Sequence, residues 1–448
     1  MRTTIAALTA GVVLAGATAL ACGSIVDSDD TMLGIIAQRT GFGPDYEVWV
    51  VDQSNSHGVA FGGAIHIYSR DALGAVSPVA EVVDLAAATT SLCQAATGAP
   101  PVRPHMIFFS AKRTHAVLSF VASGHVVIFD ARTRAPVACL RSSPGVGGAR
   151  QAHAAVPAPN DRYILVANQN GKRLERIDSD FDANTFTFDP AAAIDLTGCT
   201  TPSGAPCETP ALRPDNAPIC PLVDRTSRHA FVTLRGGGLF VVDPTVTPMR
   251  IVAEYDLATV RGNGCGGAEV GASMYVNSGG GTMTNLTQFD VYRFQTSAVK
   301  SSNAPNAPRP TVVFTDDAGH RDAHGTAVTY NQQYLWVADR AANLIEVFDT
   351  QSNNRLPPIP MVGPLSDDPT PDLLDIAPMG DLMFVTLRGP NPLSGDPHVS
   401  TGSTPGLAIM SVEDTGRSGA IRTIARISNV DDAGVERADP HGIRVRVK

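Results

Sequence analysis

The feature that most constrains this chain is a strand pattern that recurs along almost its whole length. Apolar segments such as "VWVVDQ" (48–53), "ILVANQ" (164–169) and "LWVADR" (335–340) are each followed by a second apolar strand, such as "NLIEVFDT", and then by a third. Alternating apolar residues bounded by Gly, Asn, Asp and Pro are typical of antiparallel strands. The chain is therefore expected to be all-β and built from repeats.

A further strand precedes each group, as in "HMIFFSA" and "HGTAVTY", so each unit has four strands. Four-stranded units repeated radially form a β-propeller. We predict a seven-bladed β-propeller of four-stranded antiparallel blades over residues 45–448. The first unit lacks its initial strand, and the chain ends with an extra one, "DPHGIRVRVK". The C-terminal strand is expected to complete the N-terminal blade, because closure pairs two edges that would otherwise stay open.

The segment "RYILVANQNGKRLERIDSD" resembles the YVTN-repeat β-propellers, whose relatives include lactonase-like seven-bladed proteins. The resemblance covers most of residues 45–448 and implies a fold. It implies no single activity, because that family includes secreted surface proteins, sugar lactonases and cofactor-bearing periplasmic proteins. No catalytic residue is carried over from it.

Charge and composition agree with a turn-rich exported protein that does not bind nucleic acid. The chain has 448 residues, 41 Gly and 33 Pro, and a formal net charge of −9. Frequent Gly and Pro favour turns over long helices. A nucleic-acid binder needs a concentrated basic face, and the sequence contains none, so nucleic acid is not an expected partner.

The N-terminus has the features of an export signal. Residues 1–21 combine Arg2, an apolar stretch and small residues before Cys22. "ALAC" followed by Gly23 resembles a bacterial lipobox, which makes Cys22 the lipidation site and residues 22–44 a lipidated or mobile tether. The alternative is ordinary cleavage with Cys22 incidental. We expect a monomeric periplasmic or outer-membrane lipoprotein of a bacterium that touches the membrane only through its lipid anchor.

The cysteine count supports export. Of seven cysteines, six remain after Cys22, an even number that suits disulfides in an oxidising compartment. The predicted pairs are Cys93–Cys139, Cys199–Cys207 and Cys220–Cys265. The last pair has an alternative role, because two thiolates could instead join a metal site.

Aligning the units places one residue per blade at the start of the innermost strand. These residues are His105, His153, His324, Asp372 and His441, with Ile219 and a position near Glu269 in the two other blades. Inner strands line the channel of a propeller, so the side chains should form a ring that binds a transition metal (Cu, Zn or Fe). Asp322 and Asp439, two residues before a ring histidine, are expected to orient it. The alternative is that each histidine only ties its strand to the neighbouring blade.

A second ring follows sixteen residues later and contains Val121, Gln169, Arg235, Arg340 and Arg388, with Gln53 from the N-terminal blade. Guanidinium groups bind carboxylates and phosphates through two hydrogen bonds, so this ring predicts a small anionic ligand. The alternative is that each arginine pairs with a nearby acid.

Calcium is not an expected cofactor. "DSDFDANTFTFD" (178–189) has the acidic spacing of a calcium loop, but it lacks the glycine at the sixth position and the final Glu. "DAN" is also an ordinary turn sequence.

The sequence predicts an exported β-propeller that binds a metal ion, a small anion or both at a His/Arg-lined channel mouth. Two alternatives stay open: a non-catalytic scaffold for an envelope protein, and a lactonase-like hydrolase. Whether the protein is an enzyme is also open.

Overall fold

Short antiparallel strands dominate the computed structural model, which describes residues 43–282, 285–299, 307–393 and 400–448. The strands are β1 (Tyr46–Asp52), β2 (Ala64–Ser69), β3 (Glu81–Asp84), β4 (Pro104–Phe109), β5 (His115–Phe120), β6 (His125–Asp130), β7 (Pro136–Arg141), β8 (Ala152–Pro157), β9 (Tyr163–Asn168), β10 (Arg173–Asp180), β11 (Thr185–Asp195), β12 (Pro218–Val223), β13 (Ala230–Leu234), β14 (Leu239–Asp243), β15 (Arg250–Tyr255), β16 (Gly267–Val270), β17 (Ser273–Thr282), β18 (Asn285–Gln295), β19 (Thr311–Asp316), β20 (Arg321–Val328), β21 (Tyr334–Asp339), β22 (Leu344–Asp349), β23 (Ile359–Pro360), β24 (Pro371–Ile376), β25 (Leu382–Leu387), β26 (Gly406–Glu413), β27 (Ser418–Arg426) and β28 (Pro440–Val447). The described α-helices are α2 (Arg70–Leu73) and α3 (Leu85–Thr97). The segment that mimics a calcium loop is the β10–β11 hairpin.

Hydrogen bonding groups these strands into repeated antiparallel sheets. Among the described residues there are five sheets of four strands and one of eight. The eight-stranded sheet contains β16–β19 and β20–β23, joined by a short parallel contact between β18 and β20. The unit Pro44–Lys448 is thus a multi-bladed β-propeller, as predicted. The count of seven blades stays a prediction. Counting the eight-stranded sheet as two blades gives that number.

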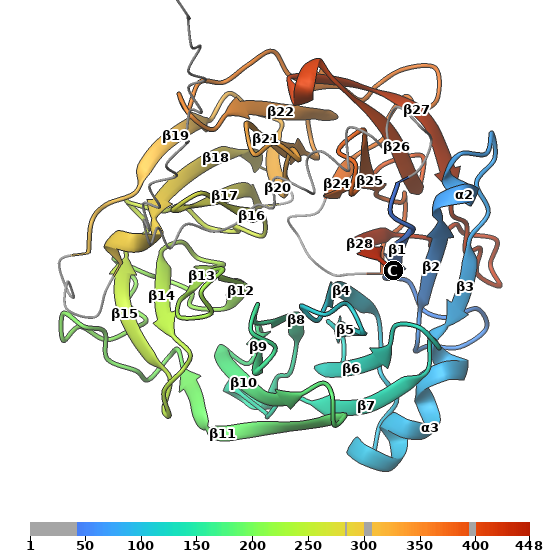
Figure 1. The fold of residues 1–448 in the computed structure, drawn as a ribbon. Helices are drawn as coiled ribbons and strands as arrows, with labels where there is room; N and C mark the ends of the chain where they lie inside the picture. The colour runs from blue at the N-terminus through green and yellow to red at the C-terminus, as the bar shows by residue number, and fades with distance from the viewer. Residues whose placement is uncertain (1–42, 283–284, 300–306, 394–399) are drawn as a thin grey trace, which may run out of the picture. The chain divides into compact units, whose positions relative to one another are not determined.

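Within this unit the sheets stand around a common centre (Figure 1). The strands β4, β8, β12, β20, β24 and β28 lie nearest to that centre, and β28 contacts both β24 and β4. The core lies between neighbouring sheets: Trp49 packs with Leu118, and Trp336 packs with Met383. All four side chains are fully buried.

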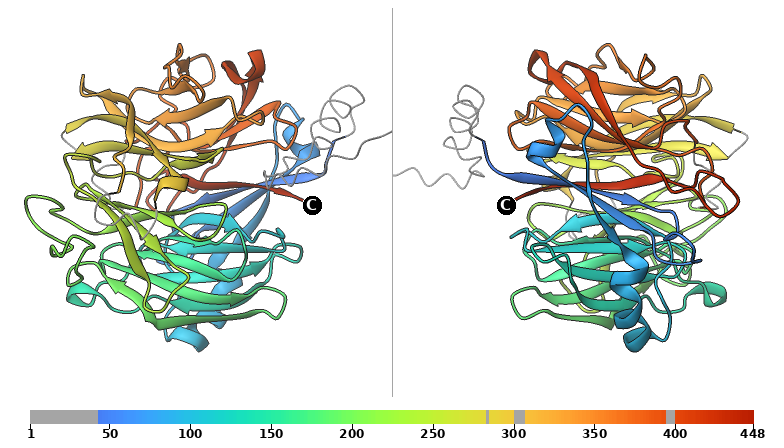
Figure 2. Two further views of the ribbon diagram at one scale, coloured as in Figure 1. Left: turned by 60° about the vertical axis from the view of Figure 1, so that its left-hand side comes forward. Right: turned by 90° about the vertical axis from the view of Figure 1, so that its right-hand side faces the viewer.

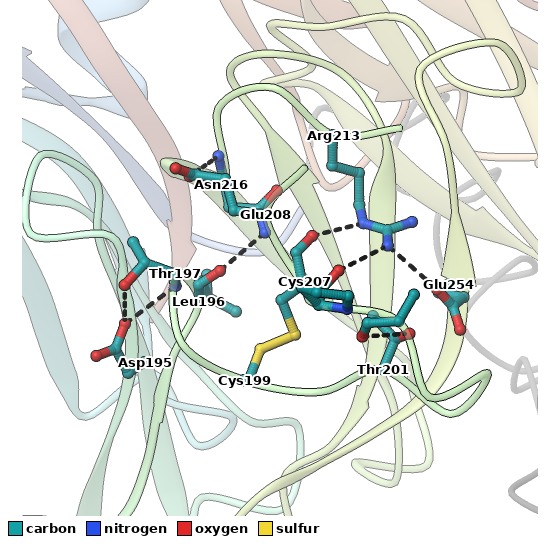
Figure 3. Close-up of a disulfide and its surroundings, with 12 residues drawn as sticks. Asp195, Leu196, Thr197, Cys199, Thr201, Cys207, Glu208, Arg213, Asn216 and Glu254 are labelled. Atoms are coloured by element: carbon teal, nitrogen blue, oxygen red, sulfur yellow. Dashed lines mark hydrogen bonds and ion pairs between the residues drawn. A yellow bond between two sulfur atoms is a disulfide. The ribbon is translucent and has the colours of Figure 1, made fainter. Parts of the chain in front are cut away.

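Two of the three predicted disulfides are present. Cys93–Cys139 connects α3 to β7, and Cys199–Cys207 closes a loop after β11. Figure 3 shows the second, where the buried Arg213 donates Nε–H to Cys207 O at 2.8 Å. This loop is therefore held by a covalent bond and by a buried guanidinium.

The predicted closure of the N-terminal blade is confirmed. Strand β28 pairs with β1 in the order β28-β1-β2-β3, with Tyr46 opposite Val447. Figure 2 shows β1, in blue, and β28, in red, running side by side in this sheet. The predicted signal peptide (1–21), Cys22 and nearly all of the predicted tether (22–44) lie outside the described residues. Across the part of the chain that is described, no helix has the length and apolar character needed to cross a membrane.

Closure predicts that the last strand is essential for stability. Deleting residues 440–448 should expose the edge of β1 and lower the free energy of unfolding by about 5 kcal/mol or more, the margin of many domains. Urea unfolding and size-exclusion chromatography measure the loss and the resulting aggregation. Replacing the exposed Val76 by Ser is the control and should change neither. A truncated chain that stays monomeric with an unchanged midpoint would contradict the closure.

Candidate metal centre

Four histidines from four inner strands meet at the centre of the propeller unit, as their shared repeat position predicts. His105 Nε2 lies 3.2 Å from His153 Nε2. The imidazoles of His105 and His441 are stacked, with centroids 4.0 Å apart, and His324 lies 5.3 Å from His441 by the same measure. Each side chain is buried, with at most 7% of its residue exposed. We call these four histidines and Asp372 the central cluster.

A β-bulge at the start of each inner strand aims the cluster residues at the centre. In β8, Ala152 pairs with Asn168 and Ala154 pairs with Ala167, so His153 between them has no partner in β9. Such an extra residue bends the strand and re-aims a side chain. The same shift by one residue occurs between Pro104 and Ile107, Pro218 and Pro221, Ala323 and Thr326, Pro371 and Leu374, and Pro440 and Ile443.

Two glycines let the inner strands approach closely at this level. A Cβ atom at Gly325 would lie 2.2 Å from Asp372 O, and one at Gly442 would lie 2.4 Å from His105 O. Real Cβ atoms do not come that near to a backbone oxygen, so a side chain at either position would push neighbouring sheets apart. Glycine at these positions keeps the centre narrow enough for imidazoles from different blades to touch.

Hydroxyl groups of the second strands hold the backbone of the next blade. Ser119 Oγ donates to His153 O at 3.1 Å, and Thr386 Oγ1 donates to His441 O at 2.9 Å. These two hydrogen bonds connect each cluster strand to the neighbouring blade through the backbone carbonyl of the histidine. They do not involve the imidazole nitrogens. Sequence reasoning missed both hydroxyls. The only signal was a polar residue inside an apolar strand.

Asp372 orients two imidazoles. Its Oδ1 lies 2.6 Å from His324 Nδ1, and its Oδ2 lies 2.5 Å from His441 Nδ1. Burial raises the pKa of Asp372, but the two imidazoles and Arg388 outweigh it and hold the pKa well below its usual range. A carboxylate on Nδ1 is the usual partner of a metal-binding histidine. The donor atoms of His324, Asp372 and His441 also lie within 4.8 Å of one another, so the role of Asp372 as a ligand stays a prediction.

The expectation that Asp322 and Asp439 orient ring histidines is wrong. Each is paired with an arginine of the second ring instead, Asp322 with Arg340 at 2.7 Å and Asp439 with Arg388 at 2.5 Å. The reason is that a guanidinium offers a carboxylate two charge-assisted hydrogen bonds at once. The bulge meanwhile turns the histidine two residues later toward the centre.

In the structure the arginines of the second ring pair with acidic residues, which is the alternative interpretation of this ring. Arg235 binds Asp215 at 2.6 Å, and Gln169 is buried. An anion at Arg235, Arg340 or Arg388 would have to displace a carboxylate. The anion-binding role of these residues stays a prediction.

Gln53 connects this ring to the cluster. Its Nε2 donates to Asp439 Oδ2 at 2.7 Å, and its Oε1 lies 2.8 Å from His105 Nδ1. Since an amide oxygen can only accept, His105 carries its proton on Nδ1 and presents an unprotonated Nε2 to the centre.

Cys220 and Cys265 lie together, but the predicted disulfide between them is wrong. Their sulfur atoms are 2.9 Å apart and both are free thiols, whereas a disulfide measures about 2.04 Å. Both sulfurs point toward the cluster, and the donor atoms of His153, Cys220 and Cys265 all lie within 4.8 Å of one another. The hydrogen bond with Cys220, followed by burial, raises the pKa of Cys265 well above its usual range.

Two of the four imidazoles, those of His105 and His441, are in the form that binds metals. Burial, and then the nearby His441, hold the pKa of His105 well below its usual range. Burial likewise lowers the pKa of His441 to about 4. Both are neutral near pH 7, which is the metal-binding state. Among the described residues, His153 Nδ1 and His441 Nε2 are buried without a hydrogen-bond partner, and such orphaned atoms are uncommon in protein interiors.

The donor set fits a transition metal. Two nitrogen ligands of a tetrahedral zinc ion stand about 3.3 Å apart, close to the 3.2 Å between His105 and His153. Imidazole and thiolate suit zinc, copper and iron, whereas calcium and magnesium prefer oxygen.

Comparisons with known proteins give the fold and no family. No family model matches the chain, and no curated protein matches it. Among solved structures, a Bacteroides fragilis protein provisionally named a 6-phosphogluconolactonase has a TM-score of 0.55 at 11% identity, covering 90% of this chain and 98% of its own. One from Bacteroides uniformis with the same provisional name has 0.55 at 12%, covering 90% and 100%.

A protein from Lactobacillus plantarum is equally similar, with a TM-score of 0.54 at 12% identity over 90% of this chain and 99% of its own. These likenesses confirm the expected resemblance to lactonase-like β-propellers at the level of fold. At such low identity they say nothing of activity.

The charge network predicts that Asp372 stabilises the centre. Replacing it by Asn should lower the free energy of unfolding by about 3–5 kcal/mol, because the buried Arg388 loses part of its countercharge. Guanidinium unfolding measures the change. Asp182→Asn, in the exposed pair with Lys112, is the control and should have no measurable effect. Equal midpoints for both variants would show that Asp372 does not hold the cluster together.

Proposed function

We propose that this protein is an exported β-propeller that binds a transition metal at its centre. The observation that carries the proposal is the convergence of buried imidazoles from separate blades, with His105 Nε2 and His153 Nε2 3.2 Å apart. Three of the four histidines have Nδ1 beside an acceptor: His105 beside Gln53, and His324 and His441 beside Asp372. This arrangement supports metal binding through Nε2.

The ligands we assign are His153, Cys220 and Cys265, whose donor atoms all lie within 4.8 Å of one another, and His105, whose Nε2 lies 3.2 Å from His153 Nε2. These four residues supply the ligands of one tetrahedral site. Thiolates favour zinc and copper(I) over harder ions, and imidazole suits both. Zinc or copper is therefore preferred to iron. A bound cation would also stabilise the thiolate forms of these two buried cysteines, since coordination deprotonates a thiol.

Export is part of the proposal. It is supported by the signal-like residues 1–21 and by the two disulfides, because disulfides persist mainly in oxidising compartments. Lipidation at Cys22 would keep such a protein at a membrane surface.

A lactonase-like hydrolase is the second candidate, and the fold likeness to proteins of that provisional name favours it. The burial of the central cluster counts against a substrate as large as a sugar phosphate. Hydrolysis of a sugar lactone by the metal-loaded protein, lost in His153→Ala, would favour the hydrolase. A non-catalytic scaffold predicts neither metal nor hydrolysis.

The test is zinc binding by the purified, reduced protein, measured by elemental analysis and competition with a chelating dye. About one tightly bound zinc per chain is expected, and His153→Ala should weaken binding by more than about 100-fold, since second-shell changes alone cost about 10–100-fold. His229→Ala is the matched control, because His229 pairs with Asp224 outside the cluster, and should bind as the unmodified protein does. Absence of bound zinc, or equal affinity in all three proteins, would overturn the proposal.

A further inference from the structure

The two cysteines beside the central cluster differ from the other cysteines of the propeller unit. Cys93, Cys139, Cys199 and Cys207 are bonded in pairs, whereas Cys220 and Cys265 are free. Cys220 lies in β12 and Cys265 lies two residues before β16, 45 residues further along the chain, and they are 2% and 5% exposed. A pair of free, adjacent thiols in a chain that forms two other disulfides calls for an explanation.

The separation of the two sulfurs is intermediate between two chemical states. It is 2.9 Å, whereas a disulfide requires about 2.04 Å. Two thiolates on one tetrahedral zinc ion, with Zn–S bonds of about 2.3 Å, stand about 3.8 Å apart. Either state is therefore reached by a movement of less than about 1 Å, which rotation of the two side chains can supply.

One residue ties the backbone on both sides of the pair. Thr233 Oγ1 accepts from the backbone N–H of Cys220 at 3.2 Å and donates to the carbonyl of Gly264, the residue before Cys265. Thr233 lies in β13 and is buried. The backbone of Cys220 and the residue before Cys265 are thus held by one side chain, so the change of state needs only the cysteine side chains to rotate.

His153 connects the pair to the metal site. Its donor atom lies within 4.8 Å of both sulfurs, and His105 Nε2 is 3.2 Å from His153 Nε2. A metal ion bound by His153 and both cysteines requires anionic thiolates, and a disulfide contains none. The two states therefore exclude each other.

We propose that Cys220 and Cys265 form a reversible dithiol–disulfide couple that controls metal occupancy, the thiolate state holding the ion and the disulfide state releasing it. This inference rests on the proposed metal-binding function. With a peroxide as oxidant, the two thiolates lose two electrons and form one S–S bond. The O–O bond of hydrogen peroxide breaks, two protons are taken up, and two water molecules and the free metal ion are produced.

The experiment uses the reduced protein loaded with zinc, a metal that does not itself change redox state. Hydrogen peroxide is added, the released zinc is measured with a chelating dye, and disulfides are mapped by mass spectrometry. We expect release of nearly all the zinc together with a new Cys220–Cys265 bond and a mass loss of two hydrogens. A thiol reductant should then restore zinc binding.

Cys265→Ser tests the couple directly, because it keeps the histidines and removes one sulfur. It should bind zinc more weakly, and peroxide should produce no reversible release. If this variant does not fold, the peptide map of the unmodified protein still decides the question. Peroxide that leaves zinc bound, or forms the disulfide without releasing zinc, overturns this inference and leaves metal binding intact. A reduced protein that binds no zinc refutes the proposed function instead.

Discussion

The close approach of the inner strands is the constraint on which the rest of the structure depends. Each inner strand that starts at a cluster position carries one extra residue there, and the bulge turns that side chain toward the centre. Gly325 and Gly442 remove the side chains that would separate neighbouring strands. Without both features the histidines would still recur in sequence, but they would stand too far apart to share one ligand.

The electrostatics of the centre follow from this packing. Asp372 is fully buried and faces His324, His441 and Arg388, so its charge is compensated at short range. The other carboxylates at this level neutralise the arginines. The fixed charges around the cluster are therefore compensated, and His105 and His441, whose pKa values are lowered by burial, are neutral near pH 7. A cation can enter such a site without meeting a cationic ring.

The fold could be predicted from the sequence because strand alternation and the spacing of the repeat are local signals. The position of His105, His153, His324 and His441 followed from that spacing alone. The orienting partners could not be predicted, because they come from other blades: Gln53 contacts His105 across 52 positions, and Asn277 donates to the carbonyl of His324 across 47. Asp322 and Asp439 were expected to orient the histidines because they are close to them in sequence. Both carboxylates bind arginines instead. In the blade near Glu269, the short inner strand could not be aligned with the others from the sequence. The residue of this blade that approaches the cluster is Cys265, whereas Glu269 binds Arg225.

The central claim is that imidazoles and thiolates from different blades bind one metal ion. X-ray absorption spectroscopy of the zinc-loaded, reduced protein tests it most directly, because sulfur and nitrogen scatter differently and bind at different distances. The account predicts a mixed shell with Zn–N near about 2.0–2.1 Å and Zn–S near about 2.3 Å. A spectrum with only oxygen or nitrogen neighbours, unchanged by Cys265→Ser, would contradict it.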